Sequence, residues 1–361
     1  MESILNILHV APNFNWCTIF ILPIAKKQYA VGNCVWISTP ENHSEINCNE
    51  SDVKFVSWHN KYNKFISHIF YSLCLINEIK KNKIQKVYLH TTIDSFFYIF
   101  VLRVFTSVDV IYVNHGVPFV GYKGIIRALF KFIEFSNLNL SHRIIAINQS
   151  MGNLLAPLNF LKIDMFILKP GTLVGVNIKY KNYKELLQLR NKYKFNNKIR
   201  IVYVGRPELR KGIYDLLKGL SETKLNYELI ILGGVESDIK IDVDSSKVKF
   251  LGYKKDLESY YLSSDILCVP SHHEGFGQIY LEAASFGVIP VCCDIPGPTD
   301  FIKHDFNGLV VKPKSTEELK KLFDNISDGL FDLEKLKYNS YVSSFAYSSE
   351  IVVESNMEFF I

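Results

Sequence analysis

Two glutamates flank a glycine-containing turn in the second half of the chain. Residues 271–278 read SHHEGFGQ after an apolar, strand-like run, and Glu282 follows in a helix-like segment. Gly275 and Gly277 permit a tight turn and a close approach of the backbone to a ligand, while the free N–H groups that open the helix attract an anion. Carboxylates accept strong hydrogen bonds from sugar hydroxyls. The spacing therefore predicts that Glu274 and Glu282 reach one ligand from the two ends of this element.

Cations that would balance an anionic ligand lie upstream of the glutamates. Gly205-Arg206 and Lys211-Gly212 stand between strand-like residues 199–204 and a helix-like segment. The guanidinium group of Arg206 can fork onto phosphate oxygens, and Lys211 adds a point charge. Cations at a helix start oppose the helix dipole, which indicates an anion nearby; the alternative is that both are ordinary exposed side chains. Together they predict the neutralisation of a diphosphate leaving group.

Histidines end two strand-like runs of the first half. His115 follows residues 108–113 and precedes Gly116. Because the carboxyl end of a parallel strand faces the ligand, His115 is predicted to line a site; the alternative is a satisfied core or capping histidine. His90-Thr91-Thr92 ends another run, where these residues either line the same edge or cap the next helix.

The sequence predicts neither a metal site nor a cofactor. Asp242-Val243-Asp244 precedes a strand, whereas a metal-diphosphate site would follow one, so we interpret it as a solvated loop. The seven cysteines include no C-x-x-C pair and their number is odd, which argues against a zinc site or a disulfide scaffold. This cysteine usage fits a reducing cytoplasm, where we expect the protein to lie.

The elements that position these residues alternate between strand and helix. The chain has 361 residues, 48% of them hydrophobic, which suggests two domains with sizeable cores. The first series of strands is predicted at residues 4–10, 34–38, 86–90, 108–113, 143–147 and 165–168. After a polar break at 176–197, the second series is predicted at residues 199–204, 228–232, 248–251, 266–270, 288–292 and 308–311. Alternation of this kind is typical of parallel sheets covered on both faces.

Two doubly wound α/β domains in tandem are therefore expected, with the ligand in the cleft between them. We expect the first domain over residues 1–176 and the second over residues 177–344. The aromatic tail, residues 345–361, is expected to form a helix that returns to the first domain, by analogy with the family named below.

The ordered motifs of residues 199–328 resemble the retaining nucleotide-sugar glycosyltransferases of family 4, which have the GT-B fold of two facing Rossmann-like domains. The marks of that family are a Gly-Arg…Lys-Gly segment and an E-x7-E motif, present here as residues 205–212 and 274–282. Single elements of this kind are weak signals, whereas the ordered set is specific. Two departures are the glycine-free loop 12–18, where Trp16 offers a stacking face instead, and Gly233-Gly234 in place of Gly-x-Gly.

The resemblance implies that residues 1–176 form an acceptor-side domain and residues 177–344 a nucleotide-sugar-binding domain, and it implies a role for each site residue. Arg206 and Lys211 would bind the donor pyrophosphate, Glu282 the ribose and Glu274 the transferred sugar, which His115 would contact near the reacting carbon. The remaining donor-binding residues are the glycines of the two loops and the backbone amides that close on the sugar and phosphate: Gly205, Gly275, Phe276, Gly277 and Gln278. The implied reaction keeps the anomeric configuration and needs no metal.

The charge distribution favours an anionic partner for the first half. Residues 1–170 hold 16 Lys and Arg against 10 Asp and Glu, while residues 171–361 hold 25 against 26. Lys123, Arg127 and Lys131 recur on one face of a helix with apolar neighbours, a pattern typical of helices that lie on anionic membranes. The alternative is a surface helix that packs on its own sheet. We expect peripheral contact with the inner face of the membrane and no nucleic-acid partner.

The predicted function is transfer of a hexose or N-acetylhexosamine from a nucleotide sugar, a UDP-sugar by family frequency, to a lipid-linked or polysaccharide acceptor. The pathway we favour is the assembly of a surface glycan such as capsule, lipopolysaccharide or O-antigen. One alternative is a non-catalytic sugar-nucleotide-binding scaffold, and another is a sugar-nucleotide epimerase of the same fold. A dinucleotide oxidoreductase is disfavoured because no G-x-G-x-x-G follows the first strand of either series.

Overall fold

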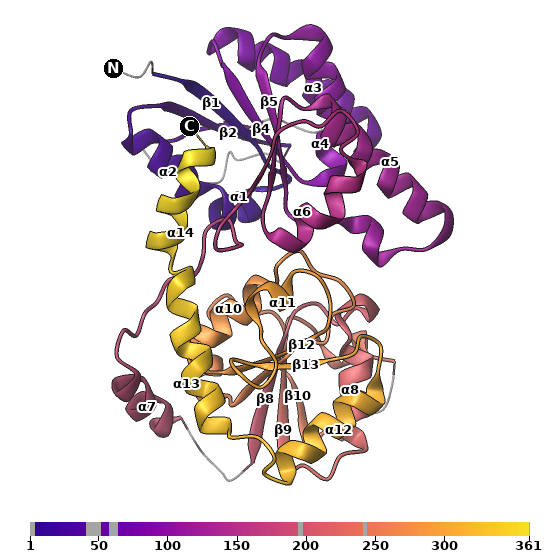
Figure 1. Cartoon of the computed structure of the whole chain (residues 1–361), viewed down its shortest axis with the longest axis vertical. Coiled ribbons are helices and arrows are strands. Elements are labelled where there is room, and N and C mark those ends of the chain that lie inside the picture. The colour runs from indigo at the N-terminus through magenta and orange to yellow at the C-terminus, as the bar shows by residue number, and fades with distance from the viewer. Residues whose placement is uncertain (1–3, 41–51, 58–63, 194–197, 241–243, 361) are drawn as a thin grey trace. The chain divides into compact units, whose positions relative to one another are not determined.

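The computed structural model describes residues 4–40, 52–57, 64–193, 198–240 and 244–360. They divide into two compact α/β units (Figure 1). The first unit comprises Met1–Val174 together with Glu350–Ile361, and the second comprises Gly175–Ser349. The divisions predicted from the sequence come after residues 176 and 344.

The first unit is built on a parallel sheet of seven strands in the order β3-β2-β1-β4-β5-β6-β7. Its strands are β1 (Asn6–Val10), β2 (Cys34–Thr39), β3 (Lys54–Ser57), β4 (Lys86–His90), β5 (Asp109–Asn114), β6 (Arg143–Ala146) and β7 (Met165–Ile167). From β1 the chain moves to β2 on one side and later returns to β4 on the other. The strand order therefore reverses between β1 and β4, the point at which such sheets bind ligands.

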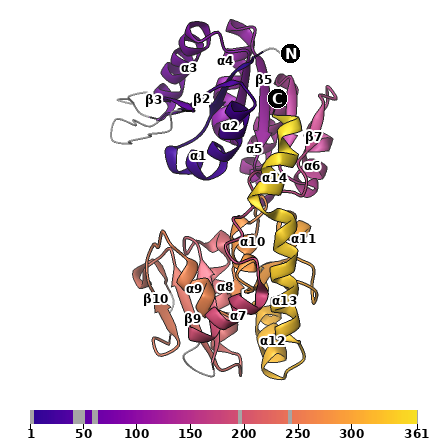
Figure 2. The same cartoon turned by 90° about the vertical axis from the view of Figure 1, so that its left-hand side faces the viewer.

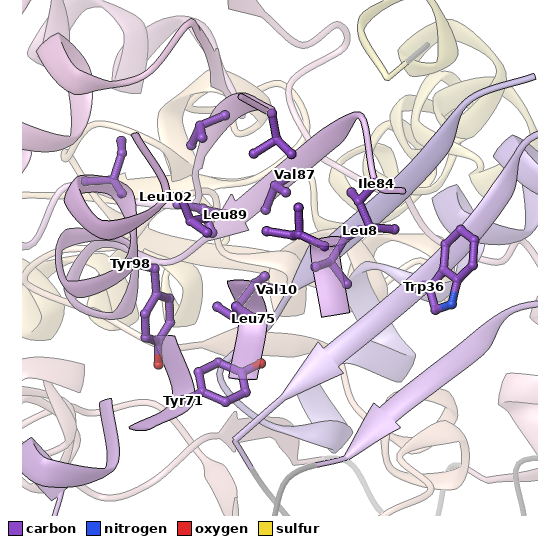
Figure 3. Close-up of a cluster of buried hydrophobic side chains, with 14 residues drawn as sticks. Leu8, Val10, Trp36, Tyr71, Leu75, Ile84, Val87, Leu89, Tyr98 and Leu102 are labelled. Atoms are coloured by element: carbon purple, nitrogen blue, oxygen red, sulfur yellow. The ribbon is translucent and has the colours of Figure 1, made fainter. Parts of the chain in front are cut away.

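Helices cover both faces of this sheet. They are α1 (Phe14–Phe20), α2 (Leu22–Ala30), α3 (Lys64–Lys81), α4 (Thr92–Phe105), α5 (Gly124–Leu140), α6 (Gln149–Leu155) and α14 (Ser349–Asn356), with short 3-10 turns η1 (Pro118–Gly121), η2 (Ala156–Leu158) and η6 (Met357–Phe359). Leu8 and Val10 of β1 pack with Val87 and Leu89 of β4 in a core that α3 and α4 cover (Figure 3). A second core, around Cys17 and Ile21, joins the opposite side of the unit to α1 and α2.

Two elements differ from the sequence prediction. The helix expected over residues 20–30 is α2, Leu22–Ala30, and the unpredicted helix α1 precedes it; Pro23 at the start of α2 has no N–H to continue α1. The edge strand β3, Lys54–Ser57, was not predicted, since four residues without a clear alternation carry too little signal.

The second unit has a parallel sheet of six strands in the order β10-β9-β8-β11-β12-β13. Its strands are β8 (Ile199–Val204), β9 (Tyr227–Leu232), β10 (Val248–Phe250), β11 (Ile266–Cys268), β12 (Ile289–Cys293) and β13 (Leu309–Val311). Here the strand order reverses between β8 and β11. The prediction of two doubly wound parallel sheets is thus confirmed.

The helices of the second unit also form two layers. They are α7 (Tyr183–Lys192), α8 (Ile213–Ser221), α9 (Glu258–Ser263), α10 (Gln278–Ser285), α11 (Pro298–Phe301), α12 (Thr316–Ser327) and α13 (Leu333–Ser344), with 3-10 turns η3 (Leu209–Lys211), η4 (Glu236–Asp238) and η5 (Phe345–Tyr347). The helices α8 and α12 pack together, whereas α10 and α13 pack on β12.

The last described residues belong to the first unit. The segment that follows α14 packs against α2 (Figure 2), and Phe360 is fully buried. Asn356 donates hydrogen bonds to the backbone carbonyls of Thr172 and Leu173, each at 2.9 Å. Among the described residues, no helix combines the length and the hydropathy needed to cross a bilayer.

Candidate functional site

Two loops lie side by side where the strand order of the second unit reverses. Residues 205–212 follow β8 and residues 269–277 follow β11, its parallel neighbour. Gly212 adopts a left-handed conformation with φ +69°, and a Cβ atom there would lie 2.0 Å from the Pro270 carbonyl oxygen. The His272 amide donates to the Arg210 carbonyl at 2.8 Å, and the His272 ring contacts the Asp215 carboxylate at 2.7 Å. The two loops are therefore in direct contact, and His272 of the second loop bonds to the first loop and to α8.

Lys211 and Glu274, predicted from the sequence to act in one site, are brought into direct contact. The Lys211 ammonium pairs with Oε1 of Glu274, and the Ser271 hydroxyl donates to the same oxygen at 2.9 Å. Both side chains of the ion pair are largely but not fully buried. This arrangement fixes a cation and a carboxylate at the carboxyl edge of the sheet, where a phosphate and a hydroxyl could replace the contacts that the two make with each other.

Arg206 lies apart from this ion pair. Its side chain is 74% exposed and pairs with Glu208 at 3.1 Å, and Glu208 also pairs with Arg210 at 2.7 Å. The Tyr203 hydroxyl donates to the Arg206 carbonyl at 3.0 Å, which holds the backbone but leaves the guanidinium group at the surface. Arg210 was not singled out from the sequence, although its position one residue before Lys211 makes it a third cation of the same loop.

Of the two glycines in the turn before α10, Gly277 has the backbone conformation expected from the sequence. Gly277 has φ +83°, and a Cβ atom there would lie 2.5 Å from the Tyr280 ring. The Gly275 carbonyl oxygen would lie 2.2 Å from a Cβ atom at Gly297, so a third glycine supports this turn. Phe276 is buried and its ring stacks with that of Tyr347 at 5.8 Å. The Gln278 side chain donates to the Gly175 carbonyl, which ties the start of α10 to the start of the unit.

Glu282 lies one turn into α10 and is partly buried. Burial raises the pKa of its carboxyl group to about 7, and the Tyr261 hydroxyl 3.4 Å away opposes this only weakly. A carboxyl group with one distant donor retains acceptor capacity for a ligand. The structure thus places Glu274 and Glu282 before and within the same helix, as the sequence predicted.

His115 of the first unit belongs to a row of three histidines. Its Nε2 atom lies 2.9 Å from Nδ1 of His90, and Nε2 of His90 lies 3.0 Å from Nδ1 of His9. Nε2 of His9 lies 2.7 Å from Oε1 of Gln28. We refer to His9, His90 and His115 as the histidine chain. His9 of β1 pairs with Tyr88 of β4, and because side chains alternate between the faces of a strand, His90 lies on the same face as His9. His90 in turn pairs with Val113 of β5, two residues before His115.

An aromatic ring packs against the end of the histidine chain, and a separate buried polar group lies on the other face of the sheet. The Trp16 ring meets the His115 ring edge-on, with centroids 4.5 Å apart. Trp16 lies in α1, whose N-cap Asn13 accepts from the Trp16 amide at 2.9 Å, so the predicted loop 12–18 is mostly a helix. The buried Glu134 accepts from the Tyr112 hydroxyl at 2.9 Å, and burial raises the pKa of its carboxyl group to about 7.

Metal ligands are not clustered in the described part of the chain: no group of three His, Cys, Asp or Glu residues there could hold an ion. Asp242 and Val243 of the acidic pair lie outside the described residues. The Asp244 carboxylate accepts hydrogen bonds from the amide and the hydroxyl of Ser246, at 3.0 and 2.5 Å.

The second unit carries the match to a known family. Residues 182–342 match the family described as glycosyl transferases group 1. This stretch, most of the second unit, is similar to that family. It includes both loops of the site and all of α10, so Lys211, Glu274 and Glu282 lie inside the matched domain.

Similar proteins act in bacterial glycan assembly. The capsular polysaccharide biosynthesis glycosyltransferase CapM of Staphylococcus aureus is 24% identical over 234 residues, 60% of this chain and 61% of its own. An N,N'-diacetylbacillosaminyl-diphospho-undecaprenol alpha-1,3-N-acetylgalactosaminyltransferase of Campylobacter jejuni is 24% identical over 238 residues, 63% of this chain and 60% of its own. The chain thus spans at most about three fifths of the length of these curated relatives.

The fold extends over the whole chain. The crystal structure of HepE from Anabaena in complex with UDP and glucose superposes with a TM-score of 0.79 over 99% of both chains, at 14% identity. A likeness at this identity shows the fold, which is the GT-B pairing of two Rossmann-like domains.

Proposed function

We propose that this protein is a metal-independent glycosyltransferase that moves a hexose or N-acetylhexosamine from a UDP-sugar to a lipid-linked or glycan acceptor, with retention at the anomeric carbon. The observation that carries the proposal is the contact of Lys211 with Glu274 at the edge where β8 and β11 end. The match of residues 182–342 to group 1 glycosyl transferases supports it. So does the neighbour HepE, which binds UDP and glucose.

In this proposal the second unit stabilises the departing diphosphate. Lys211 leaves Glu274 for the pyrophosphate, Arg206 adds a second cation, and the N–H groups at the start of α10 face the same charge. Glu274 then accepts from hydroxyls of the transferred sugar, and Glu282 accepts from the ribose. These cations make a divalent metal unnecessary for charge neutralisation.

The proposed transfer needs only the donor and the acceptor as reactants. The bond between the anomeric carbon and the phosphate oxygen breaks, and its electron pair stays on that oxygen. The acceptor oxygen bonds to the anomeric carbon on the same face, and its proton passes to the departing phosphate. His115 contacts the donor sugar in this scheme and takes no proton.

The test is a transfer assay with EDTA, using a panel of UDP- and GDP-sugars and lipid-diphosphate acceptors, followed by NMR of the product's anomeric configuration. Lys211→Met is expected to lower kcat by about 10²–10³-fold. The matched control is Lys218→Met, an exposed lysine of α8, with nearly wild-type activity. Thermal stabilisation by a UDP-sugar without sugar transfer to any acceptor would favour the non-catalytic scaffold. Conversion of the nucleotide sugar to its epimer without transfer would favour the epimerase.

We further propose that α5 attaches the protein to an anionic membrane. Residues 124–129, the first turns of α5, are all exposed, and the exposed side chains of the helix include Ile125 at 87%, Leu129 and Phe132. Lys123, Arg127 and Lys131 alternate with them and are exposed as well. The buried residues of α5, which packs against α4, begin only at Ile133. Apolar groups beside cations suit the boundary of an anionic lipid surface.

Co-sedimentation with phosphatidylglycerol vesicles tests the attachment. The double variant Arg127→Glu and Leu129→Glu is expected to lose most binding, whereas Lys335→Glu, an exposed lysine of the second unit, is expected to retain it. Equal binding of the two proteins, or binding that does not fall as salt rises, would rule out α5 as the attachment site.

A further inference from the structure

The histidine chain has a fixed end. The Phe360 backbone carbonyl can only accept a hydrogen bond, and it lies 2.5 Å from Nε2 of Gln28. The Gln28 amide group therefore faces Phe360 with its nitrogen and His9 with its oxygen. Because that oxygen only accepts, the proton between the two residues lies on Nε2 of His9.

The fixed end determines the proton positions of all three rings. Burial lowers the pKa of His9 to about 4 and that of His115 to about 3, and lowers the pKa of His90 well below its usual value. Each ring is then neutral near pH 7 and carries one N–H. With Nε2 of His9 protonated, its Nδ1 must accept from Nε2 of His90. By the same rule, Nδ1 of His90 accepts from Nε2 of His115.

The open end of the chain is consequently an acceptor. Nδ1 of His115 carries no proton, and no described residue forms a hydrogen bond with it. The His115 side chain is partly exposed, and Trp16 holds its ring edge-on. A group with a pKa near 3 is a poor general base at neutral pH, but its lone pair accepts a hydrogen bond from a hydroxyl group.

Backbone strain marks the same place independently. Thr91, directly after His90, has φ +82°, a conformation that β-branched residues rarely adopt. Strained residues of this kind persist where the surrounding structure determines them and are concentrated at functional sites. The strain lies at the end of β4, beside the point where the strand order of the sheet reverses.

We infer that Gln28, His9 and His90 are positioning residues that hold His115 in its Nε2–H tautomer, so that Nδ1 accepts a hydrogen bond from a hydroxyl group of the sugar substrate. The inference rests on the proposed function for the nature of the ligand. The tautomer itself follows from the contacts and from the neutrality of the three buried rings, and does not depend on the identity of the ligand. An anionic oxygen has no proton to donate and is disfavoured at this atom, so the chain selects for a hydroxyl group.

Nitrogen NMR of the full chain labelled with ¹⁵N-histidine tests the tautomer without any activity assay. We expect the His115 signals, assigned by their loss in His115→Asn, to show a protonated Nε2 and a bare Nδ1. His90→Phe, which keeps a ring but removes both contacts, should give a mixture of the two tautomers. His68→Phe is the matched control, because His68 is bonded to Tyr98 and is not part of the histidine chain. This substitution should leave the His115 signals unchanged.

Kinetics test the role of the open atom. His115→Phe is expected to raise the KM of the sugar substrate by about tenfold, the worth of one hydrogen bond, while His115→Asn, which keeps a polar atom near the Nδ1 position, should recover part of it. His90→Phe should raise the same KM by about twofold if half of His115 remains in the productive tautomer, with kcat nearly unchanged.

Each outcome has a distinct meaning. A His115 ring protonated on Nδ1 in the wild type, or unaffected by His90→Phe in a folded protein, overturns the positioning inference. Equal KM values for His115→Phe and the wild type overturn hydroxyl binding. If no nucleotide sugar is turned over at all, the proposed function fails while the NMR result still decides the tautomer.

Discussion

Replacing Gly212 by alanine tests whether the two loops of the second unit depend on close backbone approach. The substitution has two costs. A left-handed conformation at φ +69° costs an alanine about 1–2 kcal/mol relative to glycine. In addition, its Cβ atom would lie 2.0 Å from the Pro270 carbonyl oxygen, a contact with backbone that cannot simply rotate away.

The second unit supplies a control that separates these costs. Gly329 has nearly the same conformation, with φ +70°, but a Cβ atom there would meet nothing within 4 Å. Gly329→Ala is therefore expected to lose about 1–2 kcal/mol of unfolding free energy from strain alone. Gly212→Ala should lose a further 1–3 kcal/mol or so, the usual cost of forcing extra volume into a packed site.

Urea unfolding followed by far-UV circular dichroism measures both variants. Both glycines lie in the same unit, so the same transition reports on both substitutions. Gly212→Ala should also weaken UDP binding, because it moves Lys211 relative to Glu274, whereas Gly329→Ala should not. Equal losses of stability in the two variants would refute the argument from close approach.

Two further predictions concern buried charge. Glu282→Gln should change how stability depends on pH: the wild-type carboxyl group, with a pKa raised to about 7, adds stability that is present below about pH 4.5 and is lost as the pH rises through 7. In urea unfolding, the free energy of unfolding of the wild type minus that of the variant should therefore be smaller near pH 8 than near pH 5. An equal difference at the two pH values would contradict the burial of Glu282. Arg190→Met should lower the free energy of unfolding by about 3 kcal/mol or more, because the guanidinium group donates to the carbonyls of Tyr261, Ser264 and Phe286; a loss below about 1 kcal/mol would show that water replaces it.

The repeating parts of the fold could be predicted from the sequence. Strands such as β4 and β8 were predicted with the bounds that the structure has, because an apolar run between turn signals is a local property. Short elements without such a run were harder. The helix α1 was taken for a loop because its apolar pattern is weak, although Asn13 is a typical N-cap residue and was a usable signal.

The same contrast between local signals and contacts distant in the sequence applies to the site residues. Glu274, Lys211 and Glu282 could be proposed from the sequence because each lies in a contiguous motif. The contact between Lys211 and Glu274 joins residues 63 positions apart and could not be read from spacing. His9 was missed entirely: its partner His90 is 81 residues away, and a histidine within an apolar strand resembles any other core residue. Glu134 was hidden for the same reason, as one acid on an amphipathic helix.

The return of residues 350–361 to the first unit has a consequence for synthesis. The second unit is one continuous segment of the sequence. The first unit is incomplete until Phe360 has been synthesised, because the Phe360 carbonyl accepts a hydrogen bond from Gln28 and the Phe360 ring stacks on His9. Domains generally fold on the ribosome in the order in which they emerge. In this protein the second unit, although made later, can fold first, and the hydrogen bond from Gln28 to the Phe360 carbonyl can form only after the whole second unit has been synthesised. A ribosome stalled before Phe360 emerges should therefore carry a protease-resistant second unit joined to a first unit that is still open to cleavage.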